Sequence, residues 1–344
     1  MCAGLLLTLL LAVSCHGNKL SLHDRVATEV ACPNAQDISP CTCMLYDNEY
    51  IDVDCSLVKD EEELRHVFEA SFPTTAIRTF FMYHNQNVQQ LHNGVFGDAT
   101  FVNLVMENNA LEMVEEEVFT KSLDVSIHSS FKRNKLSDIP LDTLPLYTSL
   151  EYIDLSENLL AGSPALLSPT IRHLDLHGNA LGDLPVDTLI GIPKLTHFFA
   201  SNLELTDIHP GLFEGLVDLQ EVSLHHNNVW MIEADTFSTS GHNLQYIDLH
   251  HNSITTVAAN AFPDMDKGSS VDLGSNNITL VEEGVWRHLL EGHVRVFLQG
   301  NPLECGCDLA WVVRNSTLLE QLPHAYCNDG TPLDFLKPED FDQC

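Results

Sequence analysis

The stretch Leu219-Gln-Glu-Val-Ser-Leu-His-His-Asn-Asn-Val229 reappears 25 residues later as Leu244-Gln-Tyr-Ile-Asp-Leu-His-His-Asn-Ser-Ile254. Both copies place apolar residues at the first, fourth, sixth and eleventh positions and asparagine at the ninth. Eight positions further on, each continues with a phenylalanine, Phe237 or Phe262. The alternating apolar residues predict a short strand with one face turned inward. A single unit can bury that face only against its neighbours, so the stretch predicts a stack of coils.

The same pattern recurs about every 24 residues along the chain. Clear copies contain Asn109, Asn158 and Asn179, weaker copies surround Asn134, Leu205, Asn276 and Asn301, and a degenerate first copy lies near Ile77 to Val88. Together they predict about ten coils. Their strands are expected to form a parallel sheet on the concave side of the stack.

The repeated asparagine is interpreted as a structural residue, because its amide can donate to and accept from backbone groups that no strand satisfies. Two coils depart from the pattern. Residues Lys121 to Asn134 lack a regular strand, and Leu203 stands in an asparagine position, with Asn202 one place early. Local distortion is expected in both coils, and the sequence leaves their register open.

Residues 1–17 contain no charged side chain and include a long apolar run, which is typical of a secretory signal peptide. Residues 18–31 are interpreted as a leader. No later stretch reaches the roughly 20 apolar residues of a membrane-spanning helix, and no hydrophobic tail follows Cys344. The eight cysteines after the signal form two groups of four, which indicates an oxidising compartment. We therefore expect a secreted, extracellular protein without a membrane anchor.

The chain is strongly acidic, with a formal net charge of -33. Such a surface disfavours nucleic acid and anionic membranes as partners. The sequence contains no G-x-S-x-G, G-x-x-x-x-G-K-[ST], G-x-G-x-x-G or H-E-x-x-H motif. These observations predict a protein that is not an enzyme and has no cofactor.

The cysteines at the two ends have distinctive spacings. One group is Cys32-Pro33, Cys41-Thr-Cys43 and Cys55, and the other is Asn301-Pro-Leu-Glu-Cys305-Gly-Cys307 with Cys327 and Cys344. Spacing leaves three connectivities open in each group. Together with the repeats, these groups resemble the caps of extracellular leucine-rich-repeat proteins over residues 32–344. The resemblance implies an α/β repeat solenoid, a curved horseshoe with a concave parallel sheet and disulfide-bonded caps.

The same resemblance assigns an N-terminal cap to residues 32–72, the repeats to 73–303 and a C-terminal cap to 304–344. It implies the disulfides Cys32–Cys43, Cys41–Cys55, Cys305–Cys327 and Cys307–Cys344. The short secreted form and the segment Ser39-Pro-Cys-Thr-Cys43 are similar to arthropod secreted members of the family, among them the non-catalytic subunits of shrimp luciferases. This implies an accessory role, in which the chain binds or stabilises a partner protein that can be a separate catalytic chain. The alternative is an innate-immune type of protein that recognises microbial surface molecules.

A concave sheet offers a broad surface of side chains that the core does not require, which suits protein recognition. Candidate partner-binding residues on this surface are Phe199, Phe297, Tyr152, Tyr246, His197 and Arg172. Phe199 and Phe297 are favoured, because an exposed phenylalanine on a strand does not help solubility. Each of the six could instead be a neutral surface residue.

Histidines and aspartates recur at fixed repeat positions. His177, His225 and His250 share one column of the repeat, His226 and His251 share the next, and Asp154, Asp175, Asp248 and Asp272 form a third. The favoured interpretation is that these are ordinary surface residues and that no metal binds. The alternative is a transition-metal site or a pH-sensitive site built from His225, His250 and Asp248.

Two glycosylation sequons occur, Asn277-Ile-Thr279 and Asn315-Ser-Thr317. In a chain that passes through the secretory pathway, both asparagines are expected to carry glycans.

Overall fold

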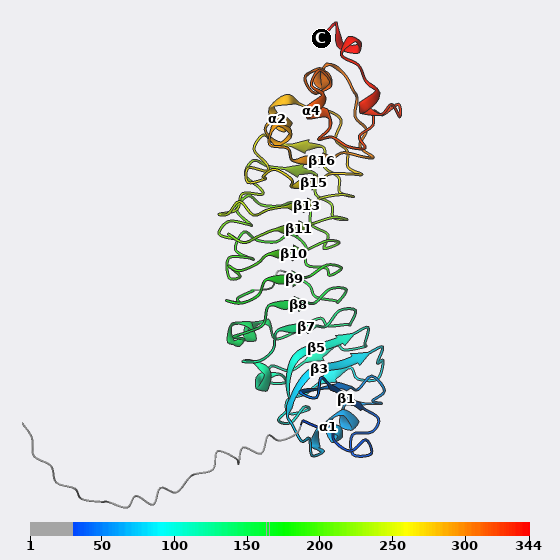
Figure 1. Ribbon diagram of the computed structural model, residues 1–344, viewed down its shortest axis with the longest axis vertical. Helices are drawn as coiled ribbons and strands as arrows, with labels where there is room; N and C mark the ends of the chain where they lie inside the picture. The colour runs from blue at the N-terminus through cyan, green and yellow to red at the C-terminus, as the bar shows by residue number, and fades with distance from the viewer. Residues whose placement is uncertain (1–29, 163, 165) are drawn as a thin grey trace, which may run out of the picture.

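In the computed structural model the chain is an elongated stack of coils, with the N-terminal coils at one end and the C-terminal cap at the other (Figure 1). The structure describes residues 30–162, 164 and 166–344, so the predicted signal peptide and most of the predicted leader lie outside the described residues. Within that part of the chain, one sheet has 12 strands in the order β1-β2-β3-β5-β7-β8-β9-β10-β11-β13-β15-β16. The predicted repeat solenoid with a parallel sheet is confirmed.

The repeats contribute ten of these strands within the described residues, which matches the predicted number of coils. They are β3 (Ala76–Tyr83), β5 (Thr100–Glu107), β7 (His128–Ser130), β8 (Tyr152–Asp154), β9 (His173–Asp175), β10 (His197–Phe199), β11 (Glu221–Ser223), β13 (Tyr246–Asp248), β15 (Ser270–Asp272) and β16 (Arg295–Phe297). Each strand is parallel to its neighbours. Two further parallel pairs lie outside this sheet, β4 (Gln90–Leu91) with β6 (Met113–Val114) and β12 (Met231–Ile232) with β14 (Thr256–Val257).

The interior of the stack is filled by the periodic apolar residues of the repeat. Phenylalanines that stand eight positions after the last apolar residue of the repeat stack from coil to coil. The ring of Phe237 lies 5.4 Å from that of Phe213 and 5.2 Å from that of Phe262, centroid to centroid, and all three are buried. This column of rings joins neighbouring coils on the side of the core away from the sheet.

The repeated asparagines also join neighbouring coils. Asn252 Nδ2 donates to the carbonyl oxygens of Leu249 in its own coil and Leu224 in the preceding one, at 3.0 and 3.1 Å. Its Oδ1 accepts from the amide of Val229 in the preceding coil, at 3.1 Å. Equivalent bonds are made by Asn158, Asn179, Asn276 and Asn301. The predicted structural role of the asparagine is confirmed.

Leu203 interrupts this asparagine ladder. Its side chain is apolar and fully buried, and it has no amide to bond to the preceding coil. The next asparagine, Asn227, accepts through Oδ1 from the amides of both Leu203 and Leu205, at 2.9 and 3.1 Å. Asn202 adopts a left-handed backbone, with φ of 53°, and does not replace the missing asparagine. Strand β10 nevertheless pairs in register with β9 and β11, so the expected distortion does not extend to the sheet.

Replacing Asn252 by alanine is expected to lower the free energy of unfolding by about 1–3 kcal/mol, because the buried amide of Val229 loses its acceptor. Urea denaturation followed by circular dichroism measures this loss. The matched control is Asn228→Ala, which removes an exposed amide from the preceding coil and should change stability by less than about 0.5 kcal/mol. Equal stability of the two variants would contradict the structural role of the ladder.

The expectation that residues Lys121 to Asn134 lack a regular strand is wrong. They contain a 3-10 helix, η1 (Thr120–Ser122), and then β7, which pairs in register with β5 and β8. Two repeat positions that are apolar in most other coils hold Ser126 and Ser129 here. Both serines are buried, with their hydroxyl oxygens 3.4 Å apart. The two serines interrupt the apolar pattern by which the strand would be recognised in the sequence. Pairing with β5 and β8 nevertheless fixes the register of β7. A second 3-10 helix, η2 (Leu141–Leu146), follows in the next coil.

The N-terminal cap consists of the antiparallel hairpin of β1 (Thr42–Tyr46) and β2 (Tyr50–Asp54), followed by helix α1 (Glu61–Glu69). The helix begins at Asp60, whose side chain accepts from the amide of Glu63 at 2.8 Å. Its buried residues are Leu64, Val67 and Phe68, and the Phe68 ring contacts rings of the first coils. The cap thus covers the apolar end of the stack.

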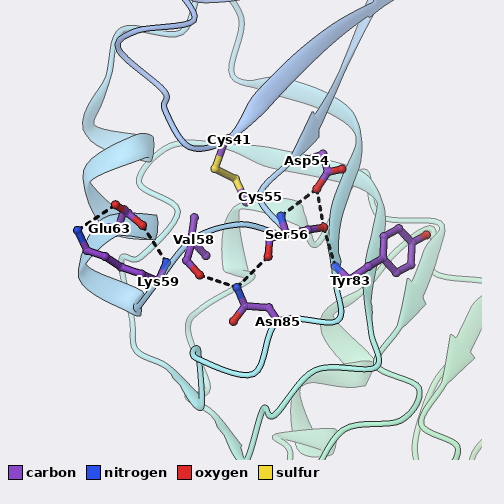
Figure 2. Close-up of a disulfide and its surroundings, with 9 residues drawn as sticks. All are labelled: Cys41, Asp54, Cys55, Ser56, Val58, Lys59, Glu63, Tyr83 and Asn85. Carbon is purple, nitrogen blue, oxygen red and sulfur yellow. Dashed lines mark hydrogen bonds and ion pairs between the residues drawn. A yellow bond between two sulfur atoms is a disulfide. The ribbon is translucent and has the colours of Figure 1, made fainter.

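Figure 2 shows how the cap is joined to the first coil around the Cys41–Cys55 disulfide. Asp54 accepts from the amide and hydroxyl of Ser56, at 2.9 and 2.6 Å, and the Ser56 hydroxyl accepts from the amide of Tyr83 at 2.9 Å. Asn85, the first asparagine of the ladder, donates to the carbonyl oxygens of Ser56 and Val58, at 3.1 and 2.6 Å. The ladder therefore begins on the cap itself.

Helix α2 (Glu283–Glu291) belongs to the last coil before the C-terminal cap. The cap itself contains η3 (Cys307–Leu309), α3 (Ala310–Val313), α4 (Ser316–Leu319), η4 (Leu333–Phe335) and η5 (Pro338–Phe341). Trp286 of α2 is buried, and Trp311 Nε1 donates to the carbonyl oxygen of Val281 at 3.0 Å. The carbonyl oxygen of Gln321 accepts from the amide of Val296 in the last strand, at 2.9 Å. The cap therefore covers both the core and the edge of the sheet.

The structure joins the eight described cysteines as Cys32–Cys43, Cys41–Cys55, Cys305–Cys327 and Cys307–Cys344. These are the pairs that the resemblance implies, two in each cap. Disulfides of this kind are typical of proteins that fold in an oxidising compartment. Among the described residues, no helix has the length and apolar character needed to cross a membrane.

Candidate binding surface

The exposed face of the 12-stranded sheet carries two columns of side chains, because each short repeat strand turns its first and third residues outward. Strand pairing places the first residues opposite one another, in the order His128, Tyr152, His173, His197, Glu221, Tyr246, Ser270 and Arg295. The first four are aromatic or imidazole rings on consecutive strands. We call His128, Tyr152, His173 and His197 the ring column.

The rings of the ring column are stacked along the stack of coils. Centroids are 4.1 Å apart between His128 and Tyr152, 4.2 Å between Tyr152 and His173, and 5.6 Å between His173 and His197. All four side chains are half-buried. Phe199, in the second column, lies 4.9 Å from His173. The five rings form a continuous, partly exposed aromatic patch over β7 to β10.

Burial opposes the ionisation of His128, Tyr152 and His173. Burial lowers the pKa of His173 to about 4, and His197 beside it acts in the same direction. Burial also lowers the pKa of His128. The pKa of Tyr152 is raised to about 12 by burial and by the carboxylates Asp154 and Asp175. At neutral pH, the patch around His173 and Tyr152 therefore presents uncharged rings.

The six candidates from the sequence do not form one cluster. Tyr152, His197 and Phe199 lie together in the aromatic patch, while Tyr246 and Phe297 lie on β13 and β16, nearer the C-terminal cap. Phe199 and Phe297 are half-buried. Arg172 precedes β9 and its exposed guanidinium lies 3.7 Å from Glu151. It does not belong to the ring column.

Sequence reasoning missed His128 and His173, which complete the ring column. Both histidines occupy the same position of the repeat as Tyr152. At His173 the repeat pattern is regular, so this equivalence could have been read from the sequence. At His128 it could not, because Ser126 and Ser129 replace the apolar residues that would align this coil with its neighbours.

The histidine columns lie just beyond the strands rather than on them. His177, His225 and His250 each stand two residues beyond the end of a strand, at its carboxyl edge. The aspartates that end strands have a structural role, because Asp154, Asp175, Asp248 and Asp272 each accept from the backbone amide two residues later. Asp154 and Asp248 are buried. The aspartate column is thus part of the turn rather than of an open ligand site.

The low pKa of His173 predicts that stability falls in mildly acidic solution. Between pH 6.5 and about 4, the unfolded chain binds a proton at this imidazole that the folded chain does not bind. The free energy of unfolding contributed by His173 therefore decreases as the pH falls through that range. Urea denaturation at pH 7 and pH 5 should show a larger loss for the wild type than for His173→Phe, which keeps a ring without a titrating group.

The control is His293→Phe, an exposed histidine outside the ring column, which should retain the wild-type difference between the two pH values. An NMR titration in which His173 has a pKa near 6.5 would contradict the prediction.

Comparisons with known proteins place this geometry among repeat proteins. The leucine rich repeat model matches residues 169–229 and 218–278. The Oplophorus-luciferin 2-monooxygenase non-catalytic subunit of Oplophorus gracilirostris is 31% identical over 317 residues, which cover 91% of this chain and 88% of that protein. A chain in the solved complex of Latrophilin 3, Unc5D and FLRT2 superposes with a TM-score of 0.65 at 19% identity, covering 81% of this chain and 86% of the other. A chain in the Drosophila Toll–Spatzle complex superposes with a TM-score of 0.55 at 16% identity, and the match covers 84% of this chain and 51% of the other.

Proposed function

Since this chain belongs to the leucine-rich-repeat family, we propose that it is a secreted, non-enzymatic accessory subunit that binds a partner protein on its concave face. The observation that carries the proposal is its identity of 31% over 91% of the chain with a relative named a non-catalytic subunit. The likeness covers 91% of this chain and 88% of the relative, so it is not confined to a few repeats. The four disulfides of the caps support passage through an oxidising compartment.

The aromatic patch of β7 to β10 is the part of the concave face best suited to hold a partner. Its rings are half-buried and packed on one another, so little side-chain freedom is lost when a partner covers them. Large aromatic side chains in such positions dominate the energy of protein interfaces. We therefore assign the centre of the interface to Tyr152, His173 and Phe199.

The charge of the chain indicates the character of the partner. A net charge of -33 repels acidic proteins and attracts a basic surface. Association with a basic partner should slow as salt is added, because the attraction between the two surfaces is screened. A partner surface with aromatic or aliphatic residues ringed by lysine and arginine fits both the patch and the charge.

The experiment is affinity capture from the source fluid with the tagged mature chain, followed by mass spectrometry. The double variant Tyr152→Ser/Phe199→Ser should lose the captured partner while retaining the wild-type circular dichroism spectrum. The matched control is Phe335→Ser, which removes an aromatic side chain that is 71% exposed on the C-terminal cap. It should capture the same partner as the wild type.

A separate catalytic chain among the captured proteins supports the accessory role, and reconstituted activity that depends on this chain would establish it. Equal capture by the wild type and the concave-face variant would place the interface elsewhere. Binding to bacteria or to polysaccharide without any protein partner would instead support the immune type of recognition.

We also propose that Asn277 and Asn315 carry N-linked glycans. Both side chains are exposed, one beside the ladder residue Asn276 and the other at the start of α4. Neither lies on the aromatic patch, so glycans at these sites leave the proposed interface open. Treatment with a glycosidase should lower the mass of the native protein, and an unchanged mass would contradict the assignment.

A further inference from the structure

Four histidines gather at the edge of the sheet, away from the aromatic patch. They are His225 and His226 after β11, and His250 and His251 after β13. The rings of His225 and His250 stack with centroids 4.6 Å apart, and those of His226 and His251 lie 4.5 Å apart. Two adjacent coils thus contribute a cluster of imidazoles.

His226 was placed in a separate column by its position in the repeat, but its backbone turns it toward the first column. Its φ of 54° is left-handed, a conformation that histidine adopts more readily than most residues. As a result, His226 Nδ1 lies 2.8 Å from His225 Nδ1, and the His226 ring lies edge-on to that of His250 at 5.2 Å. One ring nitrogen from each of His225, His226 and His250 lies within 4.8 Å of the others.

These separations suit a transition-metal ion. An ion held by imidazole nitrogens at about 2.0–2.1 Å in tetrahedral geometry has its ligands roughly 3.3 Å apart. The Nδ1 atoms of His225 and His226 are already slightly closer than that. The His250 ring is stacked on that of His225 at 4.6 Å, so its side chain must turn out of the stack to direct a nitrogen at the same ion. In the absence of an ion, two facing Nδ1 atoms can share only one proton, which leaves at least one lone pair directed at the other ring.

Asp248 fixes the orientation of the third imidazole. Its Oδ1 lies 2.5 Å from His250 Nδ1 and also accepts from the backbone amide of His250 at 3.1 Å. A carboxylate oxygen accepts, so the bond requires Nδ1 as its donor, and in the neutral tautomer the lone pair is then on Nε2. A carboxylate that orients a histidine in this way is a regular part of metal sites in proteins.

We propose that His225, His226 and His250 bind one Zn²⁺ or Cu²⁺ ion, with Asp248 as a positioning residue. Imidazole nitrogens are ligands that favour these late divalent ions over Mg²⁺ and Ca²⁺, which prefer oxygen. Three protein ligands leave one coordination position open, and His226 is exposed at the surface. That position can take water or a side chain from a protein bound on the concave face.

A second group near the cluster consists of Asp248, His250 and Asp272. Its carboxylates are already engaged, since Asp248 bonds to His250 and Asp272 accepts from the amide of Gly274 and from Gln299 Nε2, at 2.8 and 3.2 Å. An ion there would have to displace these bonds. The three imidazoles therefore provide the better site.

The test is isothermal titration of the mature chain with ZnCl₂ and with CuCl₂ at pH 7.5, after removal of metal with a chelator. One site is expected, with His226→Ala weakening binding by about 100-fold or more through the loss of a ligand. Asp248→Asn should weaken it by about 10–100-fold, the effect usual for the partner of a ligating histidine. Electron paramagnetic resonance of the Cu²⁺ form should show coupling to imidazole nitrogens that decreases in His226→Ala.

The matched control is His177→Ala. His177 stands in the same column as His225 and His250, two coils before His225. Its Nδ1 lies 3.0 Å from Asp175, and its side chain is 30% exposed, as is that of His250. It should bind metal as the wild type does. The backbone of His226 is left-handed, which is unfavourable for alanine, so the melting temperature of this variant is measured in the presence of chelator to separate loss of a ligand from loss of folding.

Three results would overturn the proposal. The first is the absence of binding by the wild type at 100-fold excess of either ion. The second is equal weakening by His177→Ala and His226→Ala. The third is retention of binding in His226→Ala with loss in Asp272→Asn, which would move the ion to the carboxylate group.

Discussion

Phe237→Ala is expected to lower the free energy of unfolding by about 3–5 kcal/mol, the range for removing a buried aromatic ring from a core. The side chain is fully buried and lies between the rings of Phe213 and Phe262 in the adjacent coils. Its removal leaves a cavity and breaks two ring contacts that each join one coil to the next. Because a repeat protein is stabilised mainly by such contacts between neighbours, cooperativity should fall as well.

Urea denaturation measures both effects, as a lower midpoint and a shallower or divided transition. Trp230→Ala is the control, since it removes a large ring that is 54% exposed, seven positions earlier in the chain. It should change stability by less than about 0.5 kcal/mol. A similarly small change in Phe237→Ala would show that the stacked phenylalanines of the core do not stabilise the stack of coils.

The double variant Cys305→Ala/Cys327→Ala is expected to lose about 2–5 kcal/mol of stability in the C-terminal cap. The bridge closes 22 residues of chain that contain η3, α3 and α4. Without it the unfolded cap gains conformational freedom, and the last coil exposes its apolar end more often. Hydrogen exchange should therefore rise in residues 304–344 and in β16, whose amide at Val296 bonds to the cap.

The control for this change is Asn328→Ala, an exposed side chain adjacent to Cys327. Its hydrogen exchange should match the wild type. Unchanged exchange in the disulfide variant would indicate that the remaining Cys307–Cys344 bridge is sufficient to hold the cap closed.

The fold could be predicted from the sequence because the residues that determine it are the ones that repeat. Leu224, Asn227 and Val229 are buried, and so are Leu249, Asn252 and Ile254 one coil later. A buried position tolerates few side chains, so the same residue types return in every coil. The prediction of the strands was wrong where buried positions hold serine, at Ser126 and Ser129, because a polar residue does not indicate a buried strand in the sequence.

The candidate surface could be predicted only in part, since outward positions of the strands are free to vary. Tyr152, His197 and Phe199 were recognised as aromatic or polar side chains on the concave face, but their contact with His128 and His173 depends on register. The closeness of His225 and His226 follows from the left-handed backbone at His226, which equivalent residues of other coils such as His251 and Ser275 share, together with ring orientations that the repeat pattern does not give. Residue type was visible in the sequence, while proximity required the structure.

The missing asparagine at Leu203 has a mechanical consequence. Elsewhere the asparagine amides tie each coil to the one before it, whereas between the coils of Asn179 and Leu203 this tie is absent. Under tension along the long axis, the junctions between coils bear the load in series, so the weakest of them parts first. The molecule should therefore yield near its middle, between β9 and β10, and separate into two disulfide-capped halves.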